Sequence, residues 1–143
     1  MEVMIAVAII AILVAVALPA YEEQVRKSRR AEGKAALLKT VQLQERFYTA
    51  SATATYSLDL APLYGLAAGA VVRSAENPAD TNGWYVLTAD TTGCVPVDLT
   101  VCVRIVATPR TGFVDANCGT LTVNSRGVRT ESGTQDNRYC WGS

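Results

Sequence analysis

The sequence predicts an α+β fold: a long N-terminal helix packed on a four-stranded antiparallel β-sheet, followed by a disulfide-bound C-terminal loop. Three observations support it. An apolar run at the N-terminus leads into an amphipathic helical segment, four segments rich in β-branched residues follow, and all four cysteines lie in the last third of the chain. A chain of 143 residues fits one compact core. A multidomain enzyme is therefore excluded.

The first element, residues 1–21, is an apolar run that reads VMIAVAIIAILVAVAL from Val3 to Leu18. About twenty apolar residues in a helix cover the roughly 30 Å hydrocarbon core of a bilayer. A secretory signal peptide is the alternative, but it normally has a basic n-region and a shorter apolar run. Pro19 removes one backbone donor and predicts a kink or break.

The second element, residues 22–50, is predicted to be an amphipathic helix. Leu37, Val41 and Tyr48 share one face of it. Such a stripe normally covers the sheet of its own domain. Gly33 is unfavourable in a helix and indicates a bend or a close approach.

Residues 51–82 are rich in Ala, Ser, Thr, Gly and Pro and are predicted to form a connecting loop with one short helical turn. Residues 83–143 hold the sheet and the C-terminal region, and residues 22–143 form one globular domain. The predicted strands are Trp84–Ala89, Leu99–Thr108, Thr120–Val123 and Val128–Thr130. A tight hairpin loop joins the last two, and short turns favour an antiparallel meander.

The cysteines are separated by seven, fifteen and twenty-one residues, with no CxxC pair. Zinc sites usually use closer pairs, so two disulfides formed outside the cytosol are favoured over a metal site or free thiols. Four cysteines allow three connectivities.

The composition argues against catalysis. Thirteen basic and thirteen acidic residues give a formal net charge of zero, and histidine is absent. No Ser-His-Asp or Cys-His centre can be built, and no calcium-loop, Walker or dinucleotide-binding pattern occurs. We expect no enzyme activity, no metal site and no cofactor.

The segment EVMIAVAIIAILVAVALPAY resembles the N-terminus of type IV pilins. The segments VRKSRRAEGKAALLKTVQLQERFYT, GWYVLTAD, RIVATP, CGTLTVNSRGVRT and the Tyr139-Cys140-Trp141 tripeptide resemble PilE-type pilins related to the ComP DNA-uptake pilins. In that family a basic leader is removed and the new amine is methylated. Ala11 stands where the family commonly has glycine, so we expect any unwinding in a filament to stay closer to Pro19.

The resemblance implies the type IV pilin fold and a structural subunit that polymerises into a type IV pilus used for adhesion, twitching motility or DNA uptake. It implies that Glu2 pairs with the terminal amine of a neighbouring subunit and that Pro19 matters for assembly. It supports a Cys118–Cys140 disulfide, which leaves Cys94–Cys102. The implied partners are other pilins, the assembly machinery and the inner membrane before assembly. The implied location is the bacterial cell surface.

The alternative is a minor pilin that acts as a DNA-binding receptor displayed on a pilus. Arg126, Arg129 and Arg138 cluster near Trp141 and Tyr139, which are expected to offer stacking faces beside a cationic patch. A second basic run contains Arg26, Lys27, Arg29 and Arg30. In a pilin this run lies on the helix near the membrane or filament core, so a solvated or subunit-pairing role is expected for it.

Overall fold

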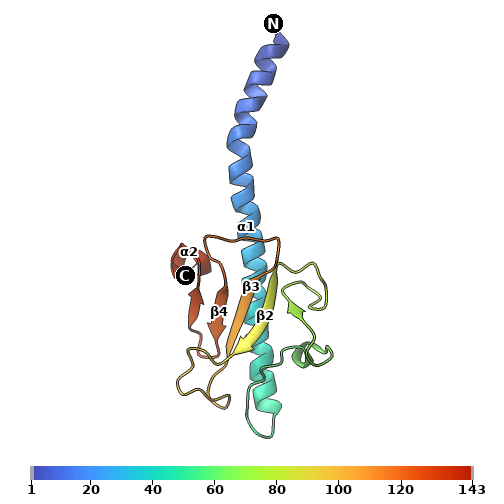
Figure 1. The fold of residues 1–143 in the computed structure, drawn as a ribbon, viewed down its shortest axis with the longest axis vertical. Helices are drawn as coiled ribbons and strands as arrows, with labels where there is room; N and C mark the ends of the chain where they lie inside the picture. The colour runs from blue at the N-terminus through green and yellow to red at the C-terminus, as the bar shows by residue number, and fades with distance from the viewer. Residues whose placement is uncertain (1, 143) are drawn as a thin grey trace. The chain divides into compact units, whose positions relative to one another are not determined.

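The computed structural model describes residues 2–142, without the side chains of Glu2, Ala8, Val16 and Ala20. By its internal contacts the chain divides into two compact units, Met1–Ala31 and Glu32–Ser143. Figure 1 shows the element order along the chain. The globular fold belongs to the second unit.

Helix α1 spans Glu2–Ala50 and contains Pro19 within it. The helix continues through the proline, so the expected break is absent from the isolated chain. Its first part contains an 18-residue window with a mean hydropathy of 3.0 and no burial, which is long and apolar enough to cross a membrane by length and composition. Val3 and Met4 illustrate this exposure, at 76% and 80%.

The sheet is an antiparallel meander with the strand order β1-β2-β3-β4-β5. Its strands are β1 (Val72–Arg73), β2 (Tyr85–Asp90), β3 (Arg104–Pro109), β4 (Leu121–Asn124) and β5 (Arg129–Glu131). The predicted antiparallel meander is confirmed, with five strands instead of four.

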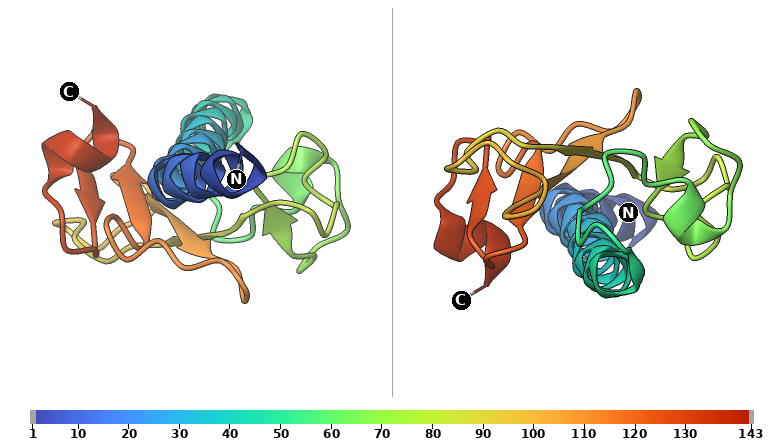
Figure 2. Two further views of the ribbon diagram at one scale, coloured as in Figure 1. Left: turned by 90° about the horizontal axis from the view of Figure 1, so that it is seen from above. Right: turned by 90° about the horizontal axis from the view of Figure 1, so that it is seen from below.

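The core lies between the sheet and the part of α1 that belongs to the globular unit, which Figure 2 shows along one face of the sheet. Alternate strand residues point into it, and the register aligns them: Leu87 pairs with Ala107, and Ile105 pairs with Val123. Leu37 of α1 is fully buried in the same cluster. Because side chains alternate across a strand, this register places one apolar face against the helix.

Residues 51–84 form the long connection. It contains a 3₁₀-helix, η1 (Pro62–Tyr64), which is the short helical turn expected there. It also contains β1, which the sequence did not indicate. Val72 pairs with Leu87 and is 2% exposed. A two-residue strand is too short to produce a recognisable pattern, and its burial depends on β2.

The strand predicted over Leu99–Thr108 begins only at Arg104. A turn holds the residues before it, because the Asp98 carbonyl accepts from the backbone N–H groups of Val101 and Cys102. The Cys94–Cys102 disulfide closes this turn. A local constraint has therefore overridden the β-propensity of the segment.

The C-terminal region also differs from the expected loop, because it contains a short helix, α2 (Asn137–Trp141). The second disulfide, Cys118–Cys140, ties this helix to the residues that precede β4. Cys118–Cys140 is the disulfide that the family resemblance implied, and Cys94–Cys102 is the pair that then remained.

A candidate nucleic-acid interface

The turn between β4 and β5 fixes the backbone around Arg126. The Asn124 side-chain carbonyl accepts from the N–H groups of Arg126, at 3.0 Å, and Val128, at 2.9 Å. Gly127 adopts φ 81°, a conformation that glycine accommodates without strain. Arg126 is exposed at the tip of this turn.

Helix α2 has defined ends. The Asp136 carboxylate accepts from the Tyr139 N–H at 2.8 Å, as an N-cap. Gly142 caps the other end in the left-handed conformation, and its N–H donates to the Arg138 carbonyl. An Asp before the helix and a Gly after it are the usual start and stop signals. These two residues were therefore the signal by which α2 could have been found in the sequence.

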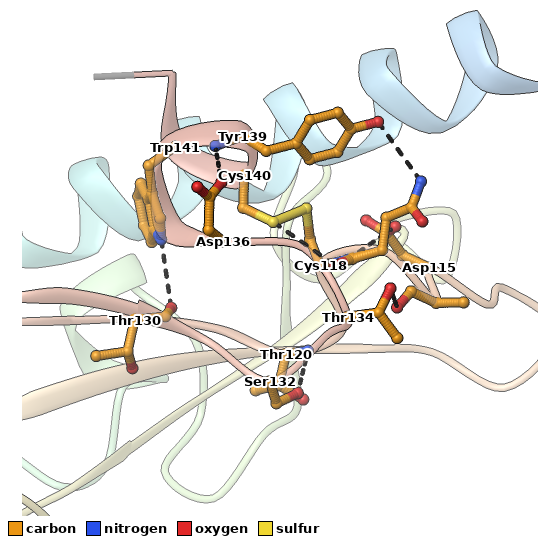
Figure 3. The surroundings of a disulfide bond; sticks show 12 residues. Asp115, Cys118, Thr120, Thr130, Ser132, Thr134, Asp136, Tyr139, Cys140 and Trp141 are labelled. Atoms are coloured by element: carbon orange, nitrogen blue, oxygen red, sulfur yellow. Dashed lines mark hydrogen bonds between the residues drawn. A yellow bond between two sulfur atoms is a disulfide. The ribbon is translucent and has the colours of Figure 1, made fainter.

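Helix α2 also protects the edge of the sheet, because β5 is the last strand. The Asn137 side-chain amide donates to the Arg129 carbonyl, and the Trp141 indole N–H donates to the Thr130 carbonyl at 3.3 Å. Both bonds hold α2 against β5, and the bond from Asn137 satisfies the Arg129 carbonyl, which the register directs away from β4. Figure 3 shows the indole directed at Thr130, beside the Cys118–Cys140 disulfide. Asn137 was not among the predicted site residues.

Arg129 lies over Trp141. The guanidinium carbon is 5.3 Å from the ring centroid, within the range of a cation–π contact. The sequence led us to expect that the Trp141 ring offers a stacking face to a nucleobase. The ring is not open in this way, because Trp141 is only 7% exposed. Tyr139, at 40% exposure, is the accessible aromatic residue of the pair. Trp141 instead supports Arg129.

Arg126, Arg129 and Arg138 are all exposed, and we refer to them together as the arginine surface. Arg129 and Arg138 come from elements joined through Asn137. Arg126 precedes Arg129 by only three residues, so their Cα atoms are about 10 Å apart at most. Within the described part of the chain, Arg126 and Arg138 have no ion-pair partner.

A fourth arginine near this turn is neutralised. Arg104 is the cross-strand partner of Asn124, but its guanidinium makes two bonds to the Asp90 carboxylate, at 2.8 and 2.7 Å. Burial raises the pKa of Asp90, yet the hydrogen bonds from Arg104 and Thr92 outweigh it and hold this pKa below its ordinary value. The Asp90 bond in turn raises the pKa of Arg104. This charge is therefore not available to a ligand.

Arg26, in the N-terminal basic run, has carboxylate partners on its own helix. The Arg26 guanidinium lies 3.2 Å from Glu23 and 3.8 Å from Glu22, all on α1. This geometry fits, at Arg26, the solvated role that was expected for the basic run, whereas Arg30 of the same run is buried, at 3% exposure. The side chain of Glu2, the expected assembly residue, lies outside the described residues. Among the residues that are described, no group of three or more His, Cys, Asp or Glu side chains is arranged to hold a metal ion.

Comparison with known proteins gives one family. The family model described as type IV minor pilin ComP, DNA uptake sequence receptor, matches residues 19–122. No curated protein matches the chain. The matched range covers well over half of the sequence, from Pro19 in α1 into β4, and the α+β architecture agrees with it. The chain therefore belongs to the family of the type IV minor pilin ComP and is a type IV pilin subunit.

Proposed function

We propose that this pilin is a minor subunit that binds DNA through its arginine surface. The observation that carries the proposal is the display of three exposed arginines on the β4–β5 turn, β5 and α2. The family match supports DNA binding, because the matched family is described as a DNA uptake sequence receptor; the match ends at residue 122, before the arginine surface.

The electrostatics favour a polyanion at this place. Arg126, Arg129 and Arg138 are accompanied in sequence by two carboxylates, Glu131 and Asp136. The Asp136 carboxylate accepts the capping hydrogen bond from the Tyr139 N–H at the N-terminus of α2. Three arginines that each neutralise one phosphate give a slope of log K against log salt of about −2.7. Binding by one subunit is thus modest and depends strongly on salt.

The remainder of the proposal concerns assembly. The exposed apolar part of α1 anchors the subunit in the inner membrane before assembly and then enters the helical core of the filament. The transfer is inexpensive because both surroundings are apolar. Pilus assembly machinery moves the subunit between them, and Glu2 and Pro19 act in this step. The proposal includes no catalytic step.

The test measures retardation of duplex DNA by the full chain, held in a non-ionic detergent. Arg126→Glu and Arg138→Glu should each weaken binding at least fivefold, and reversal of all three arginines should abolish it. Arg46→Glu is the matched control, because Arg46 is also exposed and without an ion pair among the described residues. Equal affinity of the triple variant and the unmodified chain would remove DNA binding at this surface and leave a structural pilin.

A further inference from the structure

Arg129 differs from the other two arginines of the arginine surface in how it is held. Its guanidinium lies over the Trp141 ring, whereas Arg126 and Arg138 have no ring or carboxylate partner among the described residues. A cation–π contact uses none of the N–H donors of the guanidinium. Arg129 therefore keeps its hydrogen-bonding capacity while its position is restricted.

The ring beneath Arg129 is itself fixed. Its indole N–H is bonded to the Thr130 carbonyl, and the preceding residue, Cys140, is cross-linked to Cys118. The Asn137 amide holds the Arg129 carbonyl. The backbone of Arg129 and the ring under its guanidinium are thus tied to the same strand edge. This arrangement orders the Arg129 side chain before any ligand arrives.

Ordering matters differently for the two kinds of DNA contact. A phosphate can accept hydrogen bonds from many directions, so an arginine without a fixed position can still bind it. A base edge requires two parallel N–H groups at one position, and the guanidinium fork suits guanine O6 and N7 in the major groove. An arginine whose position is set in advance loses less conformational freedom when it makes such a pair.

We infer, on the basis of the proposed DNA binding, that Arg129 reads a guanine edge in duplex DNA, with Trp141 as its positioning residue. Arg126 and Arg138 contact phosphates. Duplex DNA is inferred because a base pair presents guanine O6 and N7 together in the major groove. The Trp141 face is covered by Arg129, so it is not open for a single-stranded base to stack on.

The experiment selects bound duplexes from a random-sequence pool, using the full chain in non-ionic detergent. The unmodified chain should enrich a guanine at one fixed position. Arg129→Lys keeps the charge but not the fork, so guanine preference there should fall about tenfold. Affinity for unselected duplex should stay within about threefold, with an unchanged salt slope, because the number of cations is the same.

Three further variants complete the design. Arg46→Lys is the matched control: it makes the same charge-conserving change at an exposed arginine outside the arginine surface, so it should retain the sequence preference. Trp141→Leu removes the ring and should lower the preference as Arg129→Lys does. Trp141→Phe restores a ring and should recover part of it. The Trp141→Leu and Trp141→Phe variants are compared at the same folded fraction. A difference between them in guanine preference then reflects the ring and not a loss of stability.

Distinct outcomes would overturn the inference. If Arg129→Lys selects the same guanine as the unmodified chain, the reading role is wrong while DNA binding stands. Enrichment with no fixed guanine, or a stronger affinity for a single-stranded version of the pool, also overturns it. If the unmodified chain binds no duplex, the proposed function fails and this inference fails with it.

Discussion

Gly33 of α1 lies directly against the ring of Tyr85 in β2. A β-carbon added at Gly33 would be 2.7 Å from Cδ2 of that ring, which is closer than such atoms approach. Tyr85 is fully buried. Its ring packs edge-to-face with that of Phe113, and the two ring centroids are 5.6 Å apart. The absence of a side chain at Gly33 is therefore what lets α1 approach the sheet at Tyr85.

Gly33→Ala should destabilise the globular unit although it improves helix propensity by about 1 kcal/mol. Overpacking in a fixed core usually costs about 1–3 kcal/mol, which exceeds that gain. The measurement is the free energy of unfolding by denaturant in detergent. Ala35→Gly is the control at an exposed position two residues away, and should cost only its propensity. A Gly33→Ala variant more stable than the unmodified chain would show that Tyr85 moves freely.

The Asp90–Arg104 pair should make stability depend on acid. Asp90 has a lowered pKa in the folded state, so its stabilising effect is complete above the ordinary pKa of an aspartate and is lost as pH falls through the folded value. Both side chains are partly exposed, at 38% and 27%, so the pair contributes about 0.5–1 kcal/mol.

Asp90→Asn should therefore lower the free energy of unfolding at pH 7 and flatten its pH dependence between about pH 5 and pH 2. Glu76→Gln is the control, since Glu76 is exposed and has no ion pair among the described residues. Parallel pH profiles for Asp90→Asn and the unmodified chain would mean that the pair is not formed in solution.

The sequence predicted those parts of the fold that depend on local pattern. The apolar run and the amphipathic stripe indicated α1, and strands β2, β4 and β5 lie within one residue of their predicted starts. β1 and α2 were missed. β1 is buried only because β2 lies beside it, and α2 is held by a disulfide and by contacts with β5. Such short elements take their stability from partners distant in sequence.

The candidate site was predicted in the same partial way. Arginine is mostly exposed in folded proteins, so exposure of Arg126, Arg129 and Arg138 was expected from their residue type. The role of Trp141 did not follow, because its burial depends on α2 lying against the edge of β5. A pattern of residues gives the type of each side chain, whereas the pairing of Arg129 with Trp141 requires the tertiary fold.

Glu2→Ala should prevent or strongly reduce filament formation without unfolding the globular unit. We expect Glu2 to pair with the terminal amine of a neighbouring subunit, and removing it would leave that amine buried among apolar helices without a counter-charge. The measurement is the amount of this chain in filaments sheared from cells. Glu22→Ala is the matched control, because Glu22 is an exposed carboxylate on the same helix. A normal filament yield for Glu2→Ala contradicts the assembly role.

The two disulfides should differ in their effect on DNA binding. Cys118–Cys140 joins residues separated by 22 positions, and loss of such a link costs about 3 kcal/mol in the chain-entropy model. Cys94–Cys102 spans 8 positions and should contribute slightly less. Only Cys118–Cys140 anchors α2, which holds Arg138 and the Trp141 ring beneath Arg129.

Cys118→Ala/Cys140→Ala should therefore weaken duplex binding at least fivefold under conditions where the protein remains folded. Cys94→Ala/Cys102→Ala, the matched control, should lose stability but keep its affinity within about twofold. Affinity is compared at the same folded fraction, measured by near-ultraviolet circular dichroism. If both double variants lose affinity equally, α2 does not organise the arginine surface and general stability governs binding. If neither loses affinity, the hairpin alone is sufficient, because Arg126 and Arg129 then keep their positions without α2.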